Sequence, residues 1–347
     1  MRIAQVAPLY ESVPPAAHGG TERVVSYLTE ELVRQGHDVT LFATGDSKTT
    51  AMLHPVVHQA LRLNSQAVDH LAHHIMLLNA VVEQADRFDI IHFHVDYLHF
   101  PISRLIGWPH VTTLHGRLDL PDLQPIYDEF HDMPVVSISD AQRAPIPQAN
   151  WIGTVHHGLP DRPLIHGEPA GDYLLFLGRI SPEKRPDRAV NIAKKTGLTL
   201  KIAAKVDAVD QVYFDEQIRA LLDDPAVEYL GEVGGDKKRE LLWGAHALLF
   251  PIDWPEPFGL VMIEAMSCGT PVIAFRHGSV PEIIEEGVTG FVVDNSAEAT
   301  EAITRVASFN RVQCRQRART RFSATRMCDD YVEIYQRILS RETSKTN

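Results

Sequence analysis

Short apolar segments alternate with amphipathic segments along most of this 347-residue chain. In the first half, the segments predicted as buried strands are Arg2–Ala7, His37–Ala43, Asp89–Val95, His110–Leu114 and Val135–Ile138. Apolar residues recur at helical spacing in Thr21–Gln35 and Leu71–Gln84. Alternation of this kind predicts a parallel sheet with helices on both faces.

The alternation restarts after the Pro- and Gly-rich segment Gly158–Gly171, whose composition suits a linker. The strands predicted there are Tyr173–Arg179, Thr199–Ala204, Val227–Leu230 and Ala247–Ile252, and the helices are Pro186–Thr196, Tyr213–Leu222 and Lys237–Gly244. The sequence therefore predicts an α/β fold of two tandem, Rossmann-like, doubly wound domains. Because ligands bind beyond the carboxyl ends of the strands in such sheets, two domains that face each other would form a cleft.

Composition narrows the class of function. The chain has 33 Lys and Arg against 45 Asp and Glu, a formal net charge of −12, which argues against general nucleic-acid binding. Cys268, Cys314 and Cys328 form no C-x-x-C pair, so neither a zinc ribbon nor a disulfide scaffold is predicted. The first residues do not resemble a signal peptide, and no segment approaches the roughly 20 apolar residues of a membrane span, so we expect a cytoplasmic protein.

Two glycines, Gly19 and Gly20, stand between the first predicted strand and the helix that follows it. Amides at a helix N-terminus bind anions, and glycine allows a phosphate to approach the backbone closely. The pattern is neither G-x-G-x-x-G nor a P-loop, so an ordinary flexible turn is the alternative interpretation.

A second candidate segment, Gly178–Lys184, lies at the carboxyl end of the first strand of the second domain, where ligands bind. Arg179 and Lys184 can clamp a diphosphate, the arginine through its bidentate fork and the lysine as a point charge. A solvated charged turn is the alternative interpretation.

A third segment, Pro255–Ala274, carries two carboxylates among apolar residues. Glu256 lies in a turn after a strand, and Glu264 lies on the short helix that follows. If every step between them were helical, the two would be roughly 12 Å apart along the axis, about the length of a sugar-diphosphate-ribose unit. The helix N-terminus between them would face the phosphates. Carboxylates in apolar surroundings are costly unless they have a partner or a function.

The run E-P-F-G-L-x-x-x-E-A-M-x-x-G-x-P-V-I-A, which starts at Glu256, resembles the E-x(7)-E signature of retaining, nucleotide-sugar-dependent glycosyltransferases of family four. Other segments resemble motifs of that family in the same order, and they are Gly19-Gly20, Thr113–Gly116, Val136–Asp140, Val155–Leu159, Gly178–Lys184 and Gly287–Phe291. The resemblance spans essentially the whole chain and implies the GT-B fold. Lys201–Lys205 departs from the glycine run that many relatives have at this position.

The resemblance implies a role for each matching residue. Glu256 would bind hydroxyl groups of the donor sugar, and Glu264 would bind those of the ribose. Arg179 and Lys184 would bind the diphosphate with the help of backbone amides, which are those of Gly20, Phe258, Gly259, Leu260 and Val261. His115 would lie near the anomeric carbon on the acceptor side. The anomeric configuration would be retained by front-face attack, with the leaving phosphate accepting the proton of the acceptor.

Position along the chain suggests two more site residues. Lys205 follows a predicted strand and would add positive charge near the donor. Asp96 ends the strand that carries His92 and His94, so it is a candidate on the acceptor side.

No metal or other cofactor is predicted. The chain has no D-x-D motif, and two cations with a helix N-terminus can stabilise a leaving diphosphate. His92 and His94 point to one face of a strand, but the rest of a ligand set is missing. The arginines between Arg311 and Arg321 form a basic stretch for which a solvated helix is favoured over a membrane-docking surface.

The resemblance thus implies a retaining hexosyltransferase that moves a hexose from a UDP- or GDP-linked sugar to a hydroxyl acceptor. Residues 1–160, with a returning helix at 327–347, are expected to bind the acceptor, and residues 161–326 to bind the donor. Alternatives are a glycoside phosphorylase of the same fold, a nucleotide-sugar epimerase, a dehydrogenase and a sensor that binds the donor without turnover. The sugar, the nucleobase, the acceptor and the oligomeric state are not predicted.

Overall fold

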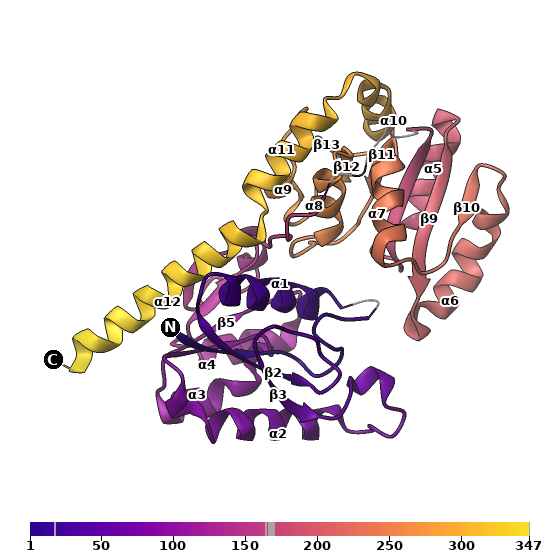
Figure 1. Ribbon diagram of the computed structural model, residues 1–347. Helices are drawn as coiled ribbons and strands as arrows, with labels where there is room; N and C mark the ends of the chain where they lie inside the picture. Colours follow the sequence, from indigo (N-terminus) through magenta and orange to yellow (C-terminus); the bar gives the residue numbers. More distant parts are fainter. Residues whose placement is uncertain (17–18, 164, 166–170, 347) are drawn as a thin grey trace. The chain divides into compact units, whose positions relative to one another are not determined.

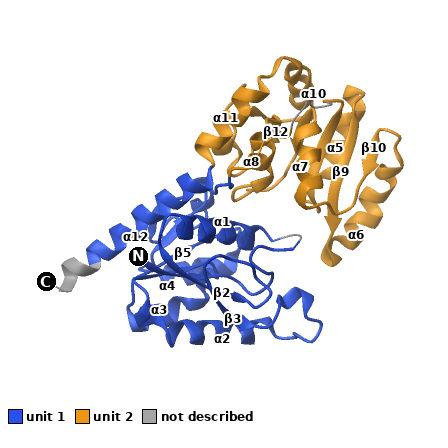
Figure 2. Cartoon of the chain, viewed as in Figure 1, with its two compact units in different colours: residues 1–160, 323–347 blue, residues 161–322 orange. Residues whose placement is uncertain are grey.

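The chain folds into two compact units in a computed structural model that describes residues 1–16, 19–163, 165 and 171–346 (Figure 1). Unit 1 comprises residues 1–160 and 323–347, and unit 2 comprises residues 161–322 (Figure 2). The chain returns to unit 1 after Phe322, four residues before the predicted boundary at residue 326. Within the predicted linker, residues 164 and 166–170 lie outside the described residues.

Unit 1 is built on a parallel sheet. In the described part of the chain it has seven strands in the order β3-β2-β1-β4-β5-β6-β7. The strands are β1 (Arg2–Val6), β2 (Asp38–Thr44), β3 (Met52–Val57), β4 (Ile90–Phe93), β5 (His110–Thr113), β6 (Val135–Ser137) and β7 (Trp151–Thr154). The helices are α1 (Gly20–Arg34), α2 (His70–Val82), α3 (Phe100–Ile106), α4 (Gln124–Glu129) and α12 (Ala324–Thr346).

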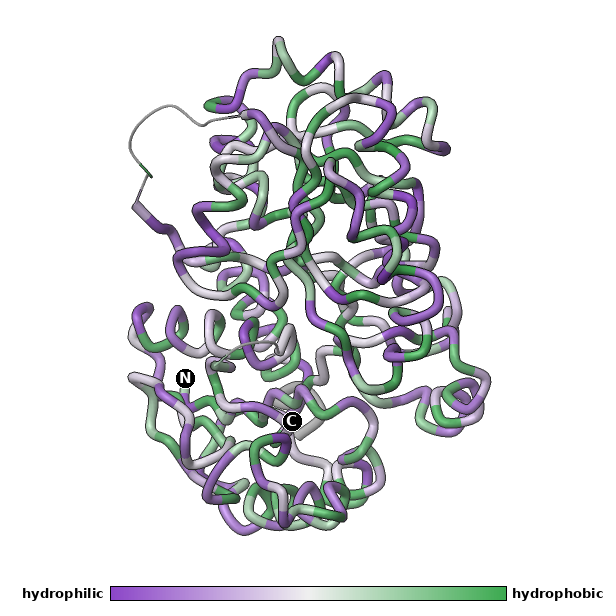
Figure 3. Tube along the Cα trace, turned by 90° about the vertical axis from the view of Figure 1, so that its right-hand side faces the viewer, coloured by the Kyte–Doolittle hydropathy of each residue, from purple (hydrophilic) through white to green (hydrophobic). Residues whose placement is uncertain are grey.

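Unit 2 repeats this plan with six described strands in the order β10-β9-β8-β11-β12-β13, and every pairing is parallel. The strands are β8 (Tyr173–Ile180), β9 (Thr199–Val206), β10 (Val227–Tyr229), β11 (Ala247–Phe250), β12 (Val272–Phe275) and β13 (Gly290–Val293). The helices are α5 (Pro186–Thr196), α6 (Gln211–Tyr213), α7 (Gly235–Gly244), α8 (Leu260–Ser267), α9 (Val280–Ile283), α10 (Ser296–Arg305) and α11 (Arg311–Arg321). Hydrophobic segments run through the interior of the unit (Figure 3).

Both sheets reverse their strand order after the third strand of the row. In unit 1 the reversal falls between β1 and β4, and in unit 2 between β8 and β11. Ligands of doubly wound sheets bind beyond the carboxyl ends of the two strands at such a switch point. We therefore expect ligand-binding residues in the loops that follow these four strands.

Several details of the structure differ from the prediction. β3, β7 and β13 were not expected, and all three are edge strands. The side chains of β3 and β7 are incompletely buried, so neither strand forms a clear apolar run. β3 also contains Pro55, which a central strand would not tolerate. The helix predicted over Tyr213–Leu222 is instead irregular, with a π-helical turn at Phe214–Ile218 and a 3₁₀ turn at Arg219–Asp223.

The arginines of α11 hold that helix against unit 2. Arg311 donates hydrogen bonds to the carbonyls of Trp243 and Ala245, and Arg321 donates to the carbonyl of Ile283 at 3.1 Å. Arg317 forms an ion pair with Glu285. These contacts give the basic stretch a structural function inside the unit. None of the helices that the structure describes combines the length and hydropathy needed to span a bilayer.

Opposite faces of the unit 1 sheet have different chemistry. Ala4 and Val6 of β1, with Ile91 and Phe93 of β4, pack in an apolar cluster with residues of α2. Because successive side chains of a strand alternate, Gln5 and its register partner His92 face the other way. On that second face, the polar pair of Gln5 and His92 lies against α12.

Two tyrosines of α12 make buried hydrogen bonds to polar residues of this face. Tyr335 Oη lies 2.7 Å from His92 Nδ1 and 3.2 Å from Gln5 Nε2. Tyr331 Oη lies 2.8 Å from Thr113 Oγ1, which lies 2.7 Å from His92 Nε2. Buried polar groups are tolerated only when they have such partners, so this network specifies where the last helix packs.

The two segments that connect the units cross closely at Gly158. A Cβ atom built there would lie 2.2 Å from the carbonyl oxygen of Ser323, and Leu159 bridges to Ser323. Only glycine fits at this crossing.

We therefore expect Gly158→Ala to lower the free energy of unfolding by about 1–3 kcal/mol, since backbone atoms must move to admit the methyl group. Gly116→Ala is the matched control, because its Cβ would meet nothing within 4 Å. Urea unfolding of both variants measures the difference. Equal midpoints for Gly158→Ala and the control would contradict the close crossing.

The buried histidines of unit 1 make a pH-dependent contribution to stability. Burial lowers the pKa of His92, His94, His99 and His157 well below the usual value and lowers the pKa of His115 to about 3. The unfolded chain protonates these imidazoles near pH 6.5, so below that pH it binds more protons than the folded chain.

The free energy of unfolding should consequently fall as the pH drops from about 7.5 to about 5.5, by up to about 1.4 kcal/mol per histidine for each pH unit below 6.5. Carboxylates with lowered pKa values contribute only below this window. Urea midpoints at several pH values test the expectation, and a flat or rising profile on acidification would rule it out.

Candidate functional site

Lys184 and Glu256 come together at the switch point of unit 2. Lys184 follows β8 and Glu256 follows β11, and these two strands are neighbours in the sheet. Their side chains form an ion pair, with 19% of the lysine side chain and 11% of the glutamate side chain exposed. Two residues far apart in the sequence are thus joined where the fold predicts ligand binding.

Aromatic rings surround this ion pair. The indole Nε1–H of Trp254 donates to Glu256 Oε2 at 3.0 Å. The Lys184 Nζ atom lies 4.8 Å from the centroid of the Trp254 ring and 5.6 Å from that of the Phe250 ring. The rings limit hydration of the charges and so strengthen electrostatic interactions at this point.

Glu264 forms a second lysine–glutamate pair. Its Oε1 lies 2.6 Å from Nζ of Lys238 on α7, and 14% of the Glu264 side chain is exposed. Glu264 shares the partly exposed face of α8 with Leu260 and Val261, whereas Met262 and Ile263 are buried in the core. Each carboxylate of the third segment therefore has one lysine partner and a remaining accessible surface.

The N-terminus of α8 lies between the two carboxylates in the sequence. Gly259 precedes the helix with φ of 82°, and a Cβ there would lie 2.6 Å from Met262 Cε, so glycine is required. Because α8 begins at Leu260, only the second half of the path from Glu256 to Glu264 is helical, which corrects the fully helical estimate. Phe258 is buried and packs edge to face on Phe322, so its side chain belongs to the core of unit 2.

Arg179 and Lys205 form a different group. They are register partners at the ends of β8 and β9. Arg179 pairs with Glu183, with Asp207 at 3.4 Å and with Asp210 at 3.7 Å, and Lys205 pairs with Asp207 at 2.8 Å. Arg179 thus contacts carboxylates other than the one that holds Lys184.

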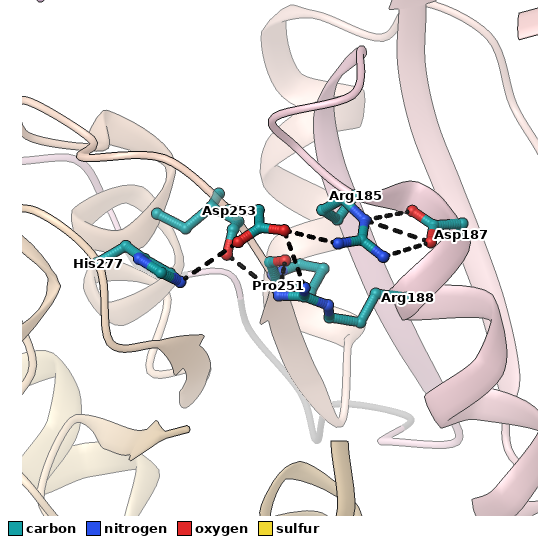
Figure 4. Close-up of polar contacts among 7 residues, drawn as sticks. Arg185, Asp187, Arg188, Pro251, Asp253 and His277 are labelled. Carbon is teal, nitrogen blue, oxygen red and sulfur yellow. Dashed lines mark hydrogen bonds and ion pairs between the residues drawn. The ribbon is translucent and has the colours of Figure 1, made fainter. Parts of the chain in front are cut away.

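An adjacent ion-pair cluster supports the loops that carry Lys184 and Glu256 (Figure 4). Asp253 accepts from Arg185 at 2.7 Å and from Arg188 at 3.1 Å, and Arg185 also contacts Asp187. The backbone N–H of Asp253 donates to the carbonyl of Glu183 at 2.8 Å. Burial tends to raise the pKa of Asp253, but the hydrogen bond from Arg185 and the charge of Arg188 outweigh it and lower the pKa. The cluster therefore links the residue after Lys184 to the segment before Glu256.

The remaining predicted residues lie in unit 1, at its switch point or after the neighbouring strand β5. Gly19 caps α1 with φ of 155°, and a Cβ there would lie 2.8 Å from Pro15 Cβ, so the turn before Gly20 requires glycine. Asp96 follows β4, has φ of 51° and is exposed to solvent. His115 follows β5 and is partly buried. β4 and β5 are neighbours, so Asp96 and His115 belong to the same edge of the sheet.

Sequence reasoning missed Lys238 and Trp254. Lys238 belongs to a run of charged residues at the start of α7, and nothing in that pattern distinguishes it from a solvated helix end. Trp254 stands two residues before Glu256, and an aromatic residue beside a candidate carboxylate was the available signal. Among the described residues, no group of three or more His, Cys, Asp or Glu side chains is arranged to hold a metal ion.

Two family profiles match the chain, one in each unit. The profile "Glycosyltransferase Family 4" matches residues 18–134, and the profile "Glycosyl transferases group 1" matches residues 166–322. The alpha-maltose-1-phosphate synthase of Mycolicibacterium smegmatis is 25% identical over 97% of this chain and all of that protein. The D-inositol 3-phosphate glycosyltransferase of Saccharomonospora viridis is 31% identical over 50% of this chain and 45% of that protein.

Solved structures match nearly the whole chain. AviGT4, a glycosyltransferase involved in avilamycin A biosynthesis, is 25% identical with a TM-score of 0.74, over 98% of both chains. HepE of Anabaena, in complex with UDP and glucose, has the same TM-score at 21% identity, over 97% of this chain and 99% of that one. The two profiles, the doubly wound sheets and these neighbours agree. The chain is therefore a glycosyltransferase of the GT-B fold, with a family 4 domain followed by a group 1 domain.

Proposed function

We propose that the enzyme transfers a hexose from a UDP- or GDP-linked donor to a hydroxyl acceptor with retention of anomeric configuration, and that it needs no metal ion. In this proposal unit 2 binds the donor and unit 1 binds the acceptor. The observation that carries it is the pair of lysine–glutamate contacts, Lys184 with Glu256 and Lys238 with Glu264, on the segment that contains the N-terminus of α8.

The chemistry of these groups suits a sugar nucleotide. Carboxylates accept hydrogen bonds from vicinal hydroxyl groups, and the family resemblance assigns Glu264 to the ribose and Glu256 to the hexose. The first N–H groups of a helix lack partners within the helix and favour anions, so the amides from Phe258 to Val261 would receive the diphosphate. Lys184 and Arg179 would add the positive charge, and Lys205 would extend it towards the end of β9.

Cations and helix amides can replace a metal in stabilising the leaving group. When the bond between the anomeric carbon and the diphosphate breaks, negative charge develops on the phosphate oxygen. Lys184, held among aromatic rings, is well placed in a region of low hydration to interact with that charge. In the retaining mechanism implied by the family resemblance, the same phosphate oxygen accepts the proton of the attacking hydroxyl.

Unit 1 supplies the acceptor side in this proposal. His115 and Asp96 offer polar groups at the same sheet edge. By contrast, Gly19 and Gly20 keep the role at the donor phosphate that the family resemblance implies. The known relatives support the substrate class, because their names include a maltose-1-phosphate synthase and an inositol-phosphate glycosyltransferase. The neighbour HepE was also solved with UDP-glucose.

Replacing Lys184 or Glu256 with alanine should lower turnover roughly 10²–10³-fold, because each removes an interaction with charge or hydroxyl groups at the reacting centre. Release of UDP or GDP from UDP-glucose or GDP-mannose, in EDTA and with a panel of polyol and glycoside acceptors, measures the rate. Lys194→Ala is the control, since Lys194 pairs with Asp224 at 2.7 Å on the surface of unit 2. Near wild-type turnover in Lys184→Ala and Glu256→Ala would refute the assignment.

The stereochemistry of transfer is a separate expectation. With an α-linked donor, the first product seen in proton NMR spectra should carry the α configuration. An inverted product would contradict the retaining mechanism. Activity that requires inorganic phosphate and a disaccharide, and no nucleotide, would identify a phosphorylase of the same fold instead.

A further inference from the structure

A chain of hydrogen bonds runs from the centre of the unit 1 sheet to His115. Gln5 Oε1 on β1 lies 2.8 Å from His94 Nε2, just beyond β4. His94 Nδ1 lies 2.9 Å from His115 Nε2, just beyond β5. Gln5 and His94 are buried, whereas His115 is partly exposed. The chain therefore connects the interior of the unit to the edge where the candidate site residues lie.

The proton positions in this chain follow from the chemistry of each group. An amide oxygen only accepts, so His94 must carry its proton on Nε2 to bond with Gln5. A neutral imidazole has one N–H group, so His94 Nδ1 then accepts a hydrogen bond. His115 must supply that proton from its own Nε2, which leaves its Nδ1 unprotonated.

The environment keeps both rings neutral. Burial lowers the pKa of His94 well below the usual value, and the neighbouring His92, His115 and His157 rings lower it further. Burial alone lowers the pKa of His115 to about 3. At neutral pH each ring therefore has one donor and one acceptor, and its tautomer is set by its partners.

The Gln5 amide has its nitrogen beside Tyr335 of α12 and its oxygen beside His94. The amide nitrogen donates to Tyr335 Oη at 3.2 Å. Tyr335 in turn can donate its proton to His92 Nδ1 at 2.7 Å, and His92 Nε2–H can donate to Thr113 Oγ1 at 2.7 Å. In this arrangement every donor has an acceptor. The reverse amide orientation would invert each bond and place the His115 proton on Nδ1.

The His115 ring is also held in place. It stacks on His157 with 5.4 Å between ring centroids and 20° between planes. Within the described part of the chain, Nδ1 of His115 has no hydrogen-bond partner. Stacking and the hydrogen bond at Nε2 therefore hold the ring, and Nδ1 makes no hydrogen bond to a described residue.

We propose that Gln5 and His94 are positioning residues that hold His115 as its Nε2–H tautomer, so that Nδ1 accepts a hydrogen bond from a substrate hydroxyl group. The substrate part of this inference rests on the proposed glycosyl transfer. The tautomer part does not, because it concerns the protein alone. A hydroxyl donates to Nδ1 only in this tautomer, since the other would present an N–H group.

Nitrogen NMR of the full chain labelled with ¹⁵N-histidine tests the proposal. Two-bond proton–nitrogen correlations distinguish a protonated ring nitrogen from an unprotonated one. The signals of His115, one of 18 histidines, are assigned by their loss in His115→Asn. We expect the wild-type chain to show unprotonated Nδ1 and protonated Nε2 at His115 at neutral pH.

Two variants test the source of this preference. Gln5→Met removes the acceptor of the His94 proton, and His94→Phe removes the acceptor of the His115 proton while keeping an aromatic ring. In both, the two nitrogens of His115 should approach an average state. Turnover should fall about two- to tenfold, in proportion to the fraction of molecules in the wrong tautomer. Ser103→Ala is the control, since Ser103 bonds to His99 and Trp108 in a separate buried network of unit 1, and it should leave the His115 signals unchanged.

A protonated Nδ1 in the wild-type chain would overturn the proposal even if a variant fails to fold. So would an unchanged tautomer in both Gln5→Met and His94→Phe. If the tautomers behave as expected but no sugar transfer is found, the proposed function fails and the control of the tautomer by Gln5 and His94 stands.

Discussion

The reversal of strand order in each sheet is the constraint on which the candidate site depends. Two parallel strands that send their connections to opposite sides leave a gap beyond their carboxyl ends, and backbone N–H groups and loop side chains can meet there. In unit 2 this brings Lys184, after β8, to Glu256, after β11. In unit 1 it places the Gly19 turn, Asp96 and His115 after β1, β4 and the next strand, β5. One topology, used twice, supplies a highly charged edge in one unit and a largely neutral, histidine-rich edge in the other.

The repeated alternation of strands and helices was enough to predict both sheets, because central parallel strands are buried on both faces and form continuous apolar runs. The edge strands β3 and β7 escaped this reasoning because their side chains are incompletely buried. The motifs located Lys184 and Glu256 but not their contact with each other, which depends on strand order. Lys238 could not be predicted, since its importance arises only from the packing of α7 beside α8. The grouping of Arg179 with three carboxylates, apart from Lys184, is likewise a product of tertiary structure.

Histidines in unit 1 illustrate a second limit of sequence reasoning. The spacing of His92 and His94 predicted that they share a face, yet it gave no account of what lies against them. The structure shows the tyrosines of α12, more than 200 residues later in the chain, completing the network through His92 and Thr113. Buried histidines that stay neutral lower the free energy of unfolding at acidic pH, because the unfolded chain binds protons there and the folded chain does not. We infer that the same buried histidines that lower stability in acid also set which nitrogen of His115 carries the proton.

The most direct test of the account is a calorimetric titration of the chain with UDP, GDP and ADP in EDTA, repeated with Glu264→Ala. The account predicts that UDP or GDP binds without metal and that the substitution weakens its binding at least about tenfold, the equivalent of about 1.4 kcal/mol. Binding that is unaffected by Glu264→Ala would contradict the placement of the nucleotide on α8. Absence of binding by every nucleotide, with binding of inorganic phosphate or a disaccharide, would contradict the nucleotide-sugar donor itself.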